Sequence, residues 1–280
     1  MIANMLKCTA AAILAAASAA PVKAAVADCN NDAGQFSEWL SAFRTEAEQS
    51  GISQGAIGAL DGATFQQSVV NKDRAQGVFS QTFLEFAGRM VNKHRMQHGA
   101  LRIKKNKQAL ASIEEQYGVP APVLVAFWGL ETDYGANMGK DSTLDALATL
   151  AFDCRRPEKF RPQLMAALKL IDRGDLSVGE MVGAWAGELG QTQFLPEDYL
   201  EAGVDFDGDG RVDLRNSEAD VLASTANFLK LAGWQAGQPW LEEVRVPPDL
   251  DWAQADLAVS HPRSQWAQWG VERTDGSALE

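Results

Sequence analysis

A glutamate, Glu131, directly follows eight uncharged residues (123–130) and precedes a polar turn that contains glycine. A carboxylate at the end of an apolar segment is held partly out of water, which disfavours its charged form and raises its pKa. A glutamate of this kind can donate a proton near neutral pH. Glu131 is therefore a candidate general acid, although a carboxylate that only ends a buried helix would show the same pattern.

A second segment, residues 184–199, offers groups that suit an uncharged polar ligand. Gly187 and Gly190 let the backbone approach a ligand closely, because glycine has no side chain. Gln191 and Gln193 supply amide donors and acceptors of the kind that bind sugar hydroxyls. A helix–loop–helix turn with a satisfied polar lining has the same composition, so both interpretations stay open at this point.

The acidic run that begins at Asp205 has the spacing of a calcium-binding loop, with Gly210 at the sharp turn. Asn216 stands where that loop normally has a glutamate, and Glu218 or Asp220 could replace it. Carboxylates this close repel one another without a cation, and hard oxygen ligands favour calcium. A solvated acidic turn is the alternative. The expected ligands are Asp205, Asp207, Asp209, Asp213, Asp220 and the carbonyl of Arg211.

Other common chemistries lack their motifs. His94 and His98 are four residues apart, but no third ligand accompanies them, which favours a solvated helix face over a zinc site. The sequence has no GxSxG elbow, no phosphate-binding glycine loop and no CxxC pair. We therefore expect no organic cofactor.

Helices are expected to position these residues. Apolar residues recur at helical spacing in three stretches, 110–117, 164–171 and 222–229. The one strand-like piece is 243–246, which two prolines close. The fold class is therefore mainly α with little strand. The helical pattern weakens from Trp240 onward, which is the one candidate boundary in the mature chain.

The first 27 residues resemble an export signal, with Lys7, an apolar run at 9–20 and small residues at 25 and 27. An uncleaved anchor is the alternative, although the run is short for a membrane span. Removal of this segment takes away two lysines, so the mature charge is 23 − 37 = −14. That charge argues against nucleic acid and anionic membranes as partners. We expect a soluble periplasmic monomer with no stable membrane insertion.

Two cysteines, Cys29 and Cys154, remain after the signal. In an oxidising compartment a lone pair is expected to form a disulfide, which here would join the N-terminus to the middle of the chain. Two separate buried thiols are the alternative.

Taken together, these segments resemble the B-type lytic murein transglycosylases, which cleave peptidoglycan and share a lysozyme-like helical core. The resemblance lies in GLETDYGANMGK, DALATLAFDCRRPEKF, AGELGQTQFLPEDY and VDFDGDGRVDLRNSEADVLASTANFLKLAGW, and it covers most of residues 70–245. It implies that Glu131 is the single catalytic acid, that Gln193 contacts the sugar, and that the aspartates hold a structural calcium ion. The implied substrate contacts also include Arg155, Arg156, Phe86, Phe228, Gln191 and Tyr134.

The sequence also departs from the family pattern. Ala184 stands where relatives have a serine, and Phe86 and Phe228 stand where relatives have tyrosines, so ring stacking is kept without a hydroxyl. The resemblance also implies that relatives carry a further segment, with aromatics and an asparagine, after the part that corresponds to residue 280. We therefore expect residues 28–240 to form the helical core and 241–280 an incomplete C-terminal part of the same catalytic unit.

The resemblance implies cleavage of the β-1,4 bond between MurNAc and GlcNAc in peptidoglycan strands without water, giving 1,6-anhydroMurNAc ends. One glutamate would act first as acid and then as base, as general acid–base catalysis allows. A lysozyme-type hydrolase, with Glu188 or Asp133 as its second carboxylate, is one alternative. A peptidoglycan-binding protein without catalytic activity is the other.

Overall fold

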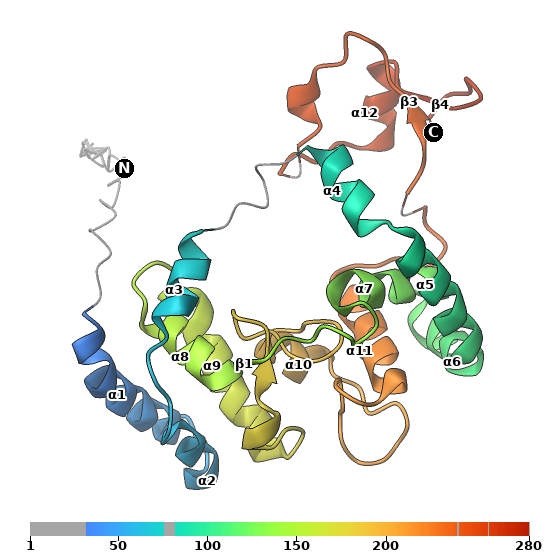
Figure 1. Cartoon of the computed structure of the whole chain (residues 1–280). Helices are drawn as coiled ribbons and strands as arrows, with labels where there is room; N and C mark the ends of the chain where they lie inside the picture. The colour runs from blue at the N-terminus through green and yellow to red at the C-terminus, as the bar shows by residue number, and fades with distance from the viewer. Residues whose placement is uncertain (1–31, 76–81, 240, 257, 280) are drawn as a thin grey trace, which may run out of the picture.

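The computed structural model describes residues 32–75, 82–239, 241–256 and 258–279, and helices dominate them (Figure 1). The mainly α class expected from the sequence is confirmed. The helices are α1 (Phe36–Gln49), α2 (Gln54–Ile57), α3 (Gln67–Arg74), α4 (Phe83–Met90), α5 (Lys93–Lys105), α6 (Lys107–Tyr117), α7 (Ala121–Thr132), α8 (Thr143–Phe152), α9 (Pro157–Arg173), α10 (Pro196–Ala202), α11 (Glu218–Leu231) and α12 (Arg263–Gln268). The strands are β1 (Asp141–Ser142), β2 (Val182–Gly183), β3 (Val244–Arg245) and β4 (Glu272–Arg273).

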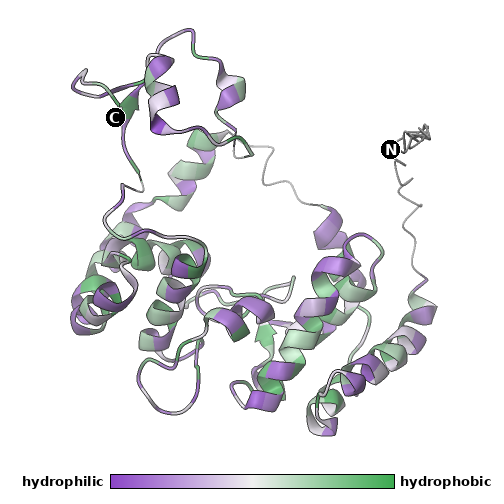
Figure 2. Cartoon of the chain, turned by 180° about the vertical axis from the view of Figure 1, so that it is seen from behind, coloured by the Kyte–Doolittle hydropathy of each residue, from purple (hydrophilic) through white to green (hydrophobic). Residues whose placement is uncertain are grey.

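The predicted apolar faces lie in one main core. Leu110, Ile113, Leu164, Leu168 and Leu222 are all buried there. Helix α8 packs along α9, and α11 packs against α6, α7 and α10. Several helices carry both hydrophobic and hydrophilic residues along their length (Figure 2), as expected for helices with one buried face.

Helix α7 is the buried helix that carries Glu131. It begins after Pro120 with a further proline in its first turn, a position where the missing N–H breaks no helical hydrogen bond. Apolar residues surround its axis, and Trp128 is completely buried. The helix ends abruptly because Asp133, Tyr134 and Gly135 all have positive φ angles. Left-handed conformations are strained for residues with side chains, and such strain often accompanies functional sites.

A short two-stranded sheet brings the end of α7 close to the 184–194 loop. Strand β1 pairs antiparallel with β2, and Asp141 lies opposite Gly183. Gly139, just before β1, has φ 86°, and a Cβ there would lie 2.1 Å from the Gly183 carbonyl oxygen. The close approach therefore requires glycine. This contact fixes the chain that leaves the Glu131 turn against the chain that enters the glycine-rich loop.

A buried carboxylate ties α3 to the connection between α8 and α9. Asp73 is almost completely buried and pairs with Arg155, at 2.5 Å between Oδ2 and Nη1, and with Arg156. Arg155 also donates to the Asp73 carbonyl oxygen at 2.8 Å. Cys154, beside this cluster, is disulfide-bonded, whereas Cys29, the partner expected from the sequence, lies outside the described residues.

The C-terminal segment has its own small core. Leu250, Val271 and Leu279 form a cluster separate from the main one, and Val244 of β3 and Trp266 of α12 pack against it. Figure 1 shows β3, β4 and α12 close together in this segment. Strand β3 lies within the strand-like piece predicted at 243–246. The predicted signal at 1–27 lies outside the described residues. Among the helices that are described, none is both long and apolar enough to cross a membrane.

Candidate active site

Glu131 lies in the last turn of α7 and is exposed to solvent. The protein atoms around its carboxyl nevertheless desolvate it, and this desolvation raises its pKa above that of an ordinary glutamate. The nearby negative charge of Glu188 raises the pKa further. The direction agrees with the one expected from the apolar run before it. Glu131 therefore has the environment of a proton donor.

Gln191 is the buried junction between α7 and the loops around it, and it is only 7% exposed. Its side-chain Oε1 accepts from Trp128 Nε1 at 2.7 Å, and its Nε2 donates to the Arg215 carbonyl oxygen at 2.8 Å. Its backbone carbonyl accepts from Thr132 Oγ1 at 2.6 Å. Both ends of the amide are thus used inside the protein. This geometry favours a positioning role for Gln191 over the direct sugar contact that the sequence suggested.

Gln193 is placed differently from Gln191. Its backbone has φ 54°, and its side-chain Nε2 donates to the Gly190 carbonyl oxygen at 2.9 Å. Its Oε1 accepts no hydrogen bond from any other residue that the structure describes. The half-buried Gln193 therefore keeps an acceptor for a ligand hydroxyl or amide, with its orientation fixed by the glycine turn.

The aromatic residues expected at the site have different environments. Tyr134 is buried, and its hydroxyl donates to the Arg95 carbonyl oxygen at 2.6 Å. Phe228 on α11 packs against Phe194, with 5.1 Å between ring centroids. Phe86 on α4 is 37% exposed and offers an open ring. Tyr134 therefore shapes the turn after Glu131, while Phe86 remains available for stacking.

The two candidate second carboxylates also differ. Asp133 pairs with Arg95 at 2.5 Å, and this contact lowers the pKa of Asp133. It is therefore held as a paired anion. Glu188 is half-buried, and its Oε2 is buried without a hydrogen-bond partner among the described residues. Of these two carboxylates, Glu188 is the one whose negative charge raises the pKa of Glu131.

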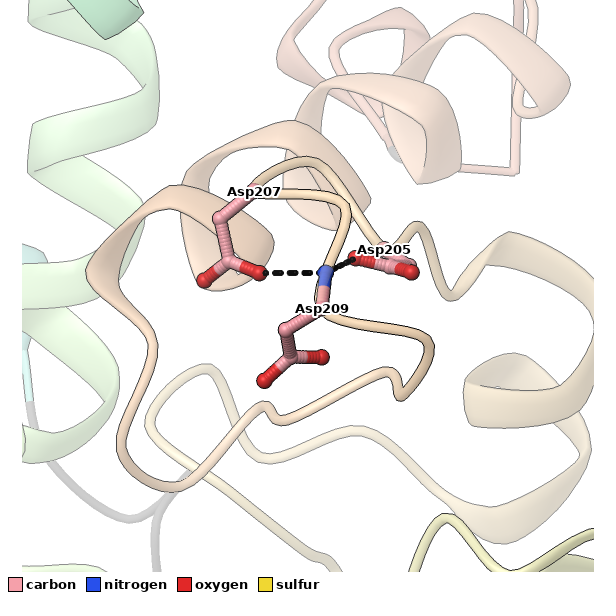
Figure 3. A group of neighbouring side chains, drawn as sticks. All are labelled: Asp205, Asp207 and Asp209. Atoms are coloured by element: carbon pink, nitrogen blue, oxygen red, sulfur yellow. Dashed lines mark hydrogen bonds between the residues drawn. The ribbon is translucent and has the colours of Figure 1, made fainter.

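The acidic loop divides the predicted metal ligands into two groups. Asp205, Asp207 and Asp209 each offer an oxygen, and these atoms lie within 4.8 Å of one another (Figure 3). Backbone N–H groups hold them in place, since Asp209 N donates to both Asp205 and Asp207. This set of hard oxygen donors fits calcium better than a transition metal.

The side chains of the other three predicted ligands make hydrogen bonds or ion pairs within the protein. Asp220 is completely buried and accepts from the backbone N–H groups of Phe206 and Asp213, both at 2.8 Å. Asp213 accepts from Arg215 N at 2.9 Å. The Arg211 side chain pairs with Glu180 at 2.8 Å. Asp220 therefore closes the loop from inside, and its place among the ligands of the ion stays a prediction.

The acidic loop is connected to the candidate site by three contacts. Arg215 Nη1 donates to the Val182 carbonyl oxygen at 2.5 Å, and Arg211 reaches Glu180 in the short 3-10 helix η4 (Val178–Glu180). The third contact is the hydrogen bond from Gln191 to Arg215. Sequence reasoning missed these links because each joins residues more than 20 positions apart and no local motif marks them.

His94 and His98 are both exposed on α5, with 4.1 Å between their ring centroids. No carboxylate, cysteine or further histidine of the described residues completes a metal site with them. The exposure of both rings agrees with the solvated helix face expected from the sequence.

Replacement of Gln191 by leucine tests its role as a junction. Gln191→Leu keeps approximate volume but leaves Trp128 Nε1 and the Arg215 carbonyl unpaired, which should lower the free energy of unfolding by about 2–4 kcal/mol. Urea denaturation measures the change. The matched control is Gln67→Leu on the exposed side of α3, expected to stay within about 0.5 kcal/mol. Equal effects of the two substitutions would contradict the assignment.

Comparison with known proteins finds relatives among the lytic murein transglycosylases. The Escherichia coli membrane-bound lytic murein transglycosylase B is 35% identical over 156 residues, which are 55% of this chain and 43% of that protein. The chain therefore spans less than half the length of this curated relative.

Two solved structures have the same fold. SltB3 from Pseudomonas aeruginosa, in complex with NAG-NAM-pentapeptide, superposes with a TM-score of 0.80 at 40% identity, over 88% of this chain and 66% of that one. The Escherichia coli lytic transglycosylase Slt35, in complex with calcium, gives a TM-score of 0.71 at 29% identity, over 84% of this chain and 75% of that one.

The chain also matches a family model over most of its length. Residues 35–280 match the family described as "Transglycosylase SLT domain". The lysozyme-like helical fold inferred from the sequence is confirmed by the superpositions. This chain therefore belongs to the SLT-domain family of lytic transglycosylases.

Proposed function

We propose that this chain is a lytic transglycosylase that cleaves the β-1,4 bond between MurNAc and GlcNAc in peptide-bearing peptidoglycan. The observation that supports this most is the position of Glu131, an exposed carboxyl with a raised pKa at the end of a buried helix. Relatives with the same fold are lytic transglycosylases, and SltB3 has been solved with NAG-NAM-pentapeptide.

In the proposed reaction Glu131 is both acid and base. Protonated Glu131 gives its proton to the glycosidic oxygen as the bond from MurNAc C1 to that oxygen breaks. The substrate's own N-acetyl oxygen stabilises the positive charge at C1. Glu131, now an anion, removes the proton from the C6 hydroxyl, whose oxygen bonds to C1 and closes a 1,6-anhydro ring. No water is consumed, and the glutamate ends in its starting protonation state.

Other residues of the site position the reactants. The free Oε1 of Gln193 can accept a hydrogen bond from the sugar, and the open ring of Phe86 can stack on it. Gln191, Trp128 and Thr132 hold the loop and α7 in a fixed relation. A rigid site places substrate and acid in reacting geometry, and this proximity contributes a large part of the rate.

Hydrolysis is the second candidate reaction, and the geometry at Asp133 disfavours it. An inverting or retaining hydrolase needs a second free carboxylate beside the sugar. Asp133 is paired with Arg95, so it does not fill that role. Glu188 is the remaining candidate, and the reaction products distinguish the two activities.

We also propose that the acidic loop binds calcium in a structural role. Asp205, Asp207 and Asp209 would supply carboxylate oxygens. The Arg211 carbonyl, Asp213 and Asp220, which the sequence also predicts as ligands, would add further oxygens. Bound calcium would neutralise the loop and stiffen the Arg215 and Arg211 contacts to the site. Slt35, a relative, has been solved with calcium. We further propose that the mature protein acts as a monomer in the periplasm.

Glu131→Gln should abolish turnover, because the amide cannot donate and then recover a proton. We expect the rate on purified peptidoglycan to fall by about 100-fold or more. Mass spectrometry of the soluble products should show 1,6-anhydromuropeptides with the unmodified protein and none with the variant. Reducing-end products from the unmodified protein would instead establish a hydrolase, and sugar binding without products would establish a binding protein.

Glu188→Gln should change the pH dependence. The negative charge of Glu188 raises the pKa of Glu131, so its removal should lower that pKa. Glu131 would then lose its proton at lower pH, and the alkaline limb of the pH–rate profile should move to lower pH. The control is Glu158→Gln, an exposed position on α9, which should leave the limb unchanged. A shift to higher pH would contradict the proposed coupling.

Calcium should stabilise the fold through the acidic loop. At free calcium about 100-fold above its dissociation constant, a single site adds about 2.7 kcal/mol to the free energy of unfolding. Calorimetry should therefore show a higher unfolding temperature with calcium than with a chelator. Asp205→Asn should remove this difference, whereas Asp249→Asn, an exposed aspartate outside the loop, should retain it. Stabilisation that persists in Asp205→Asn would place the ion elsewhere.

A further inference from the structure

Arg102 on α5 lies over two aromatic rings that come before and after Glu131 in the sequence. Its guanidinium carbon is 5.0 Å from the centroid of the Trp128 ring and 6.0 Å from that of the Tyr134 ring. A cation within about 6 Å of a ring centroid is attracted to the face of the ring. Trp128 belongs to the last turns of α7, and Tyr134 follows the end of that helix. Arg102 therefore connects the helix that carries the candidate acid to the turn that follows it.

The two rings pack against each other in a fixed geometry. Trp128 and Tyr134 meet edge to face, with 5.6 Å between their centroids and an interplanar angle of 82°. The Tyr134 hydroxyl lies close to two glycines, because a Cβ would lie 2.8 Å from it at Gly99 and 2.6 Å from it at Gly129. A larger residue at either position would displace the tyrosine. The Tyr134 ring is thus placed by α5 and α7 together.

The turn after Glu131 needs such support because its backbone is strained. Asp133 and Tyr134 have φ angles of 51° and 63°, and such conformations persist only where the surroundings enforce them. Two arginines of α5 contact this turn. Arg95 pairs with Asp133 at 2.5 Å, and Arg102 lies over the Tyr134 ring. The strained residues are therefore held in place from the α5 side.

An ion pair with Glu218 holds the guanidinium of Arg102. Glu218 Oε1 accepts from Arg102 Nη1 at 2.6 Å and from Lys105 Nζ at 2.8 Å. Its Oε2 accepts from Asn106 Nδ2 at 2.9 Å. Burial disfavours the charge of Glu218, but the hydrogen bonds from Lys105 and Asn106 outweigh this effect. Together with the charge of Arg102 they lower the pKa of Glu218. Glu218 is therefore an anion, and both of its oxygens are used.

Glu218 also connects Arg102 to the acidic loop. It is the first residue of α11, and Ser217 directly before it is the N-cap of that helix. The Ser217 hydroxyl donates to Asp207 Oδ2 at 2.7 Å, so the start of α11 is joined to one of the three clustered aspartates. Helix α11 also packs against α7 (Figure 1). A chain of contacts thus runs from the loop, through Glu218 and Arg102, to the rings on either side of Glu131.

We propose that Arg102 is a positioning residue, which fixes the orientation of the Glu131 carboxyl through the Trp128–Tyr134 ring pair. This inference rests on the proposed function, in which Glu131 gives a proton to the glycosidic oxygen and then takes one from the C6 hydroxyl. Both transfers need the carboxyl in a defined place. A guanidinium suits this task because it is flat, stacks on rings and still presents N–H groups to a carboxylate.

Kinetics on a soluble peptidoglycan fragment that contains the MurNAc–GlcNAc bond separate positioning from stability. Arg102→Met keeps the length of the side chain but removes the cation. We expect kcat to fall by about tenfold, because small displacements of reacting groups slow a reaction strongly, and KM to change by less than about twofold. Release of 1,6-anhydromuropeptides, followed by mass spectrometry well below the unfolding temperature, gives both constants.

Lys105→Met is the matched control. Lys105 pairs with the same carboxylate as Arg102, but its side chain is 62% exposed and lies over no aromatic ring of the described residues. Both substitutions remove one partner of Glu218, so a contribution to stability alone would make the two variants behave alike. We expect Lys105→Met to retain the kcat and KM of the unmodified protein.

A second variant covers the case in which Arg102→Met does not fold. Arg102→Gln retains an N–H donor for Glu218 but lacks the cation. The side chain of Arg102 is 29% exposed, so the polar amide is not forced into the core. We expect Arg102→Gln to fold and to lose kcat to a similar extent.

The outcomes separate this inference from the proposed function. A lower kcat in the Arg102 variants, with kcat unchanged in Lys105→Met, supports the positioning role. An unchanged kcat in a folded Arg102 variant, or an equal fall in Lys105→Met, overturns it and leaves the transglycosylase proposal standing. A higher KM with unchanged kcat would make Arg102 a substrate contact, which also overturns it. If the unmodified protein releases no anhydromuropeptide, the proposed function itself fails, and the inference fails with it.

Discussion

The buried amide of Gln191 is the contact on which the arrangement of the site depends. It joins α7 through Trp128 and Thr132 to the end of the acidic loop through Arg215. A polar group can be buried this deeply only if both its donor and its acceptor are paired, so the three segments fit in one relative position. The same side chain also requires glycine at position 135. Gly135 has φ 87°, and a Cβ there would lie 2.3 Å from Gln191 Oε1.

This rigid frame allows Glu131 to remain in an unfavourable environment. Desolvation and the charge of Glu188 both raise its pKa, so the folded state holds this proton to higher pH than the unfolded chain does. Folding therefore becomes less favourable as pH rises from the ordinary pKa of a glutamate through the raised one. The turn at Asp133 and Tyr134, with φ angles of 51° and 63°, adds backbone strain in the same place. The buried core around Trp128 offsets both.

Charge is used in two contrasting ways around the site. Asp73 neutralises part of the Arg155–Arg156 pair and anchors α3, while Arg95 neutralises Asp133. In contrast, Glu188 and the three loop aspartates form no ion pair with any residue that the structure describes, and the aspartates lie where we propose calcium. Paired charges thus hold the fold, and unpaired charges mark the surfaces for which we propose ligands.

The sequence by itself determined the local features. Apolar spacing predicted the helices and their buried faces, the uncharged run before Glu131 predicted its raised pKa, and the aspartate spacing predicted the cluster at 205–209. Only the tertiary structure showed that Gln191 turns inward, that Asp220 closes its loop from inside, and that Asp73 holds the arginine pair. The physical reason is how far apart in the sequence the interacting residues lie. A helix face or a metal loop is encoded within a dozen neighbouring residues, whereas Trp128 and Gln191 are 63 positions apart and Asp73 and Arg155 are 82 apart. Which partner such a polar group finds is decided when the helices pack together.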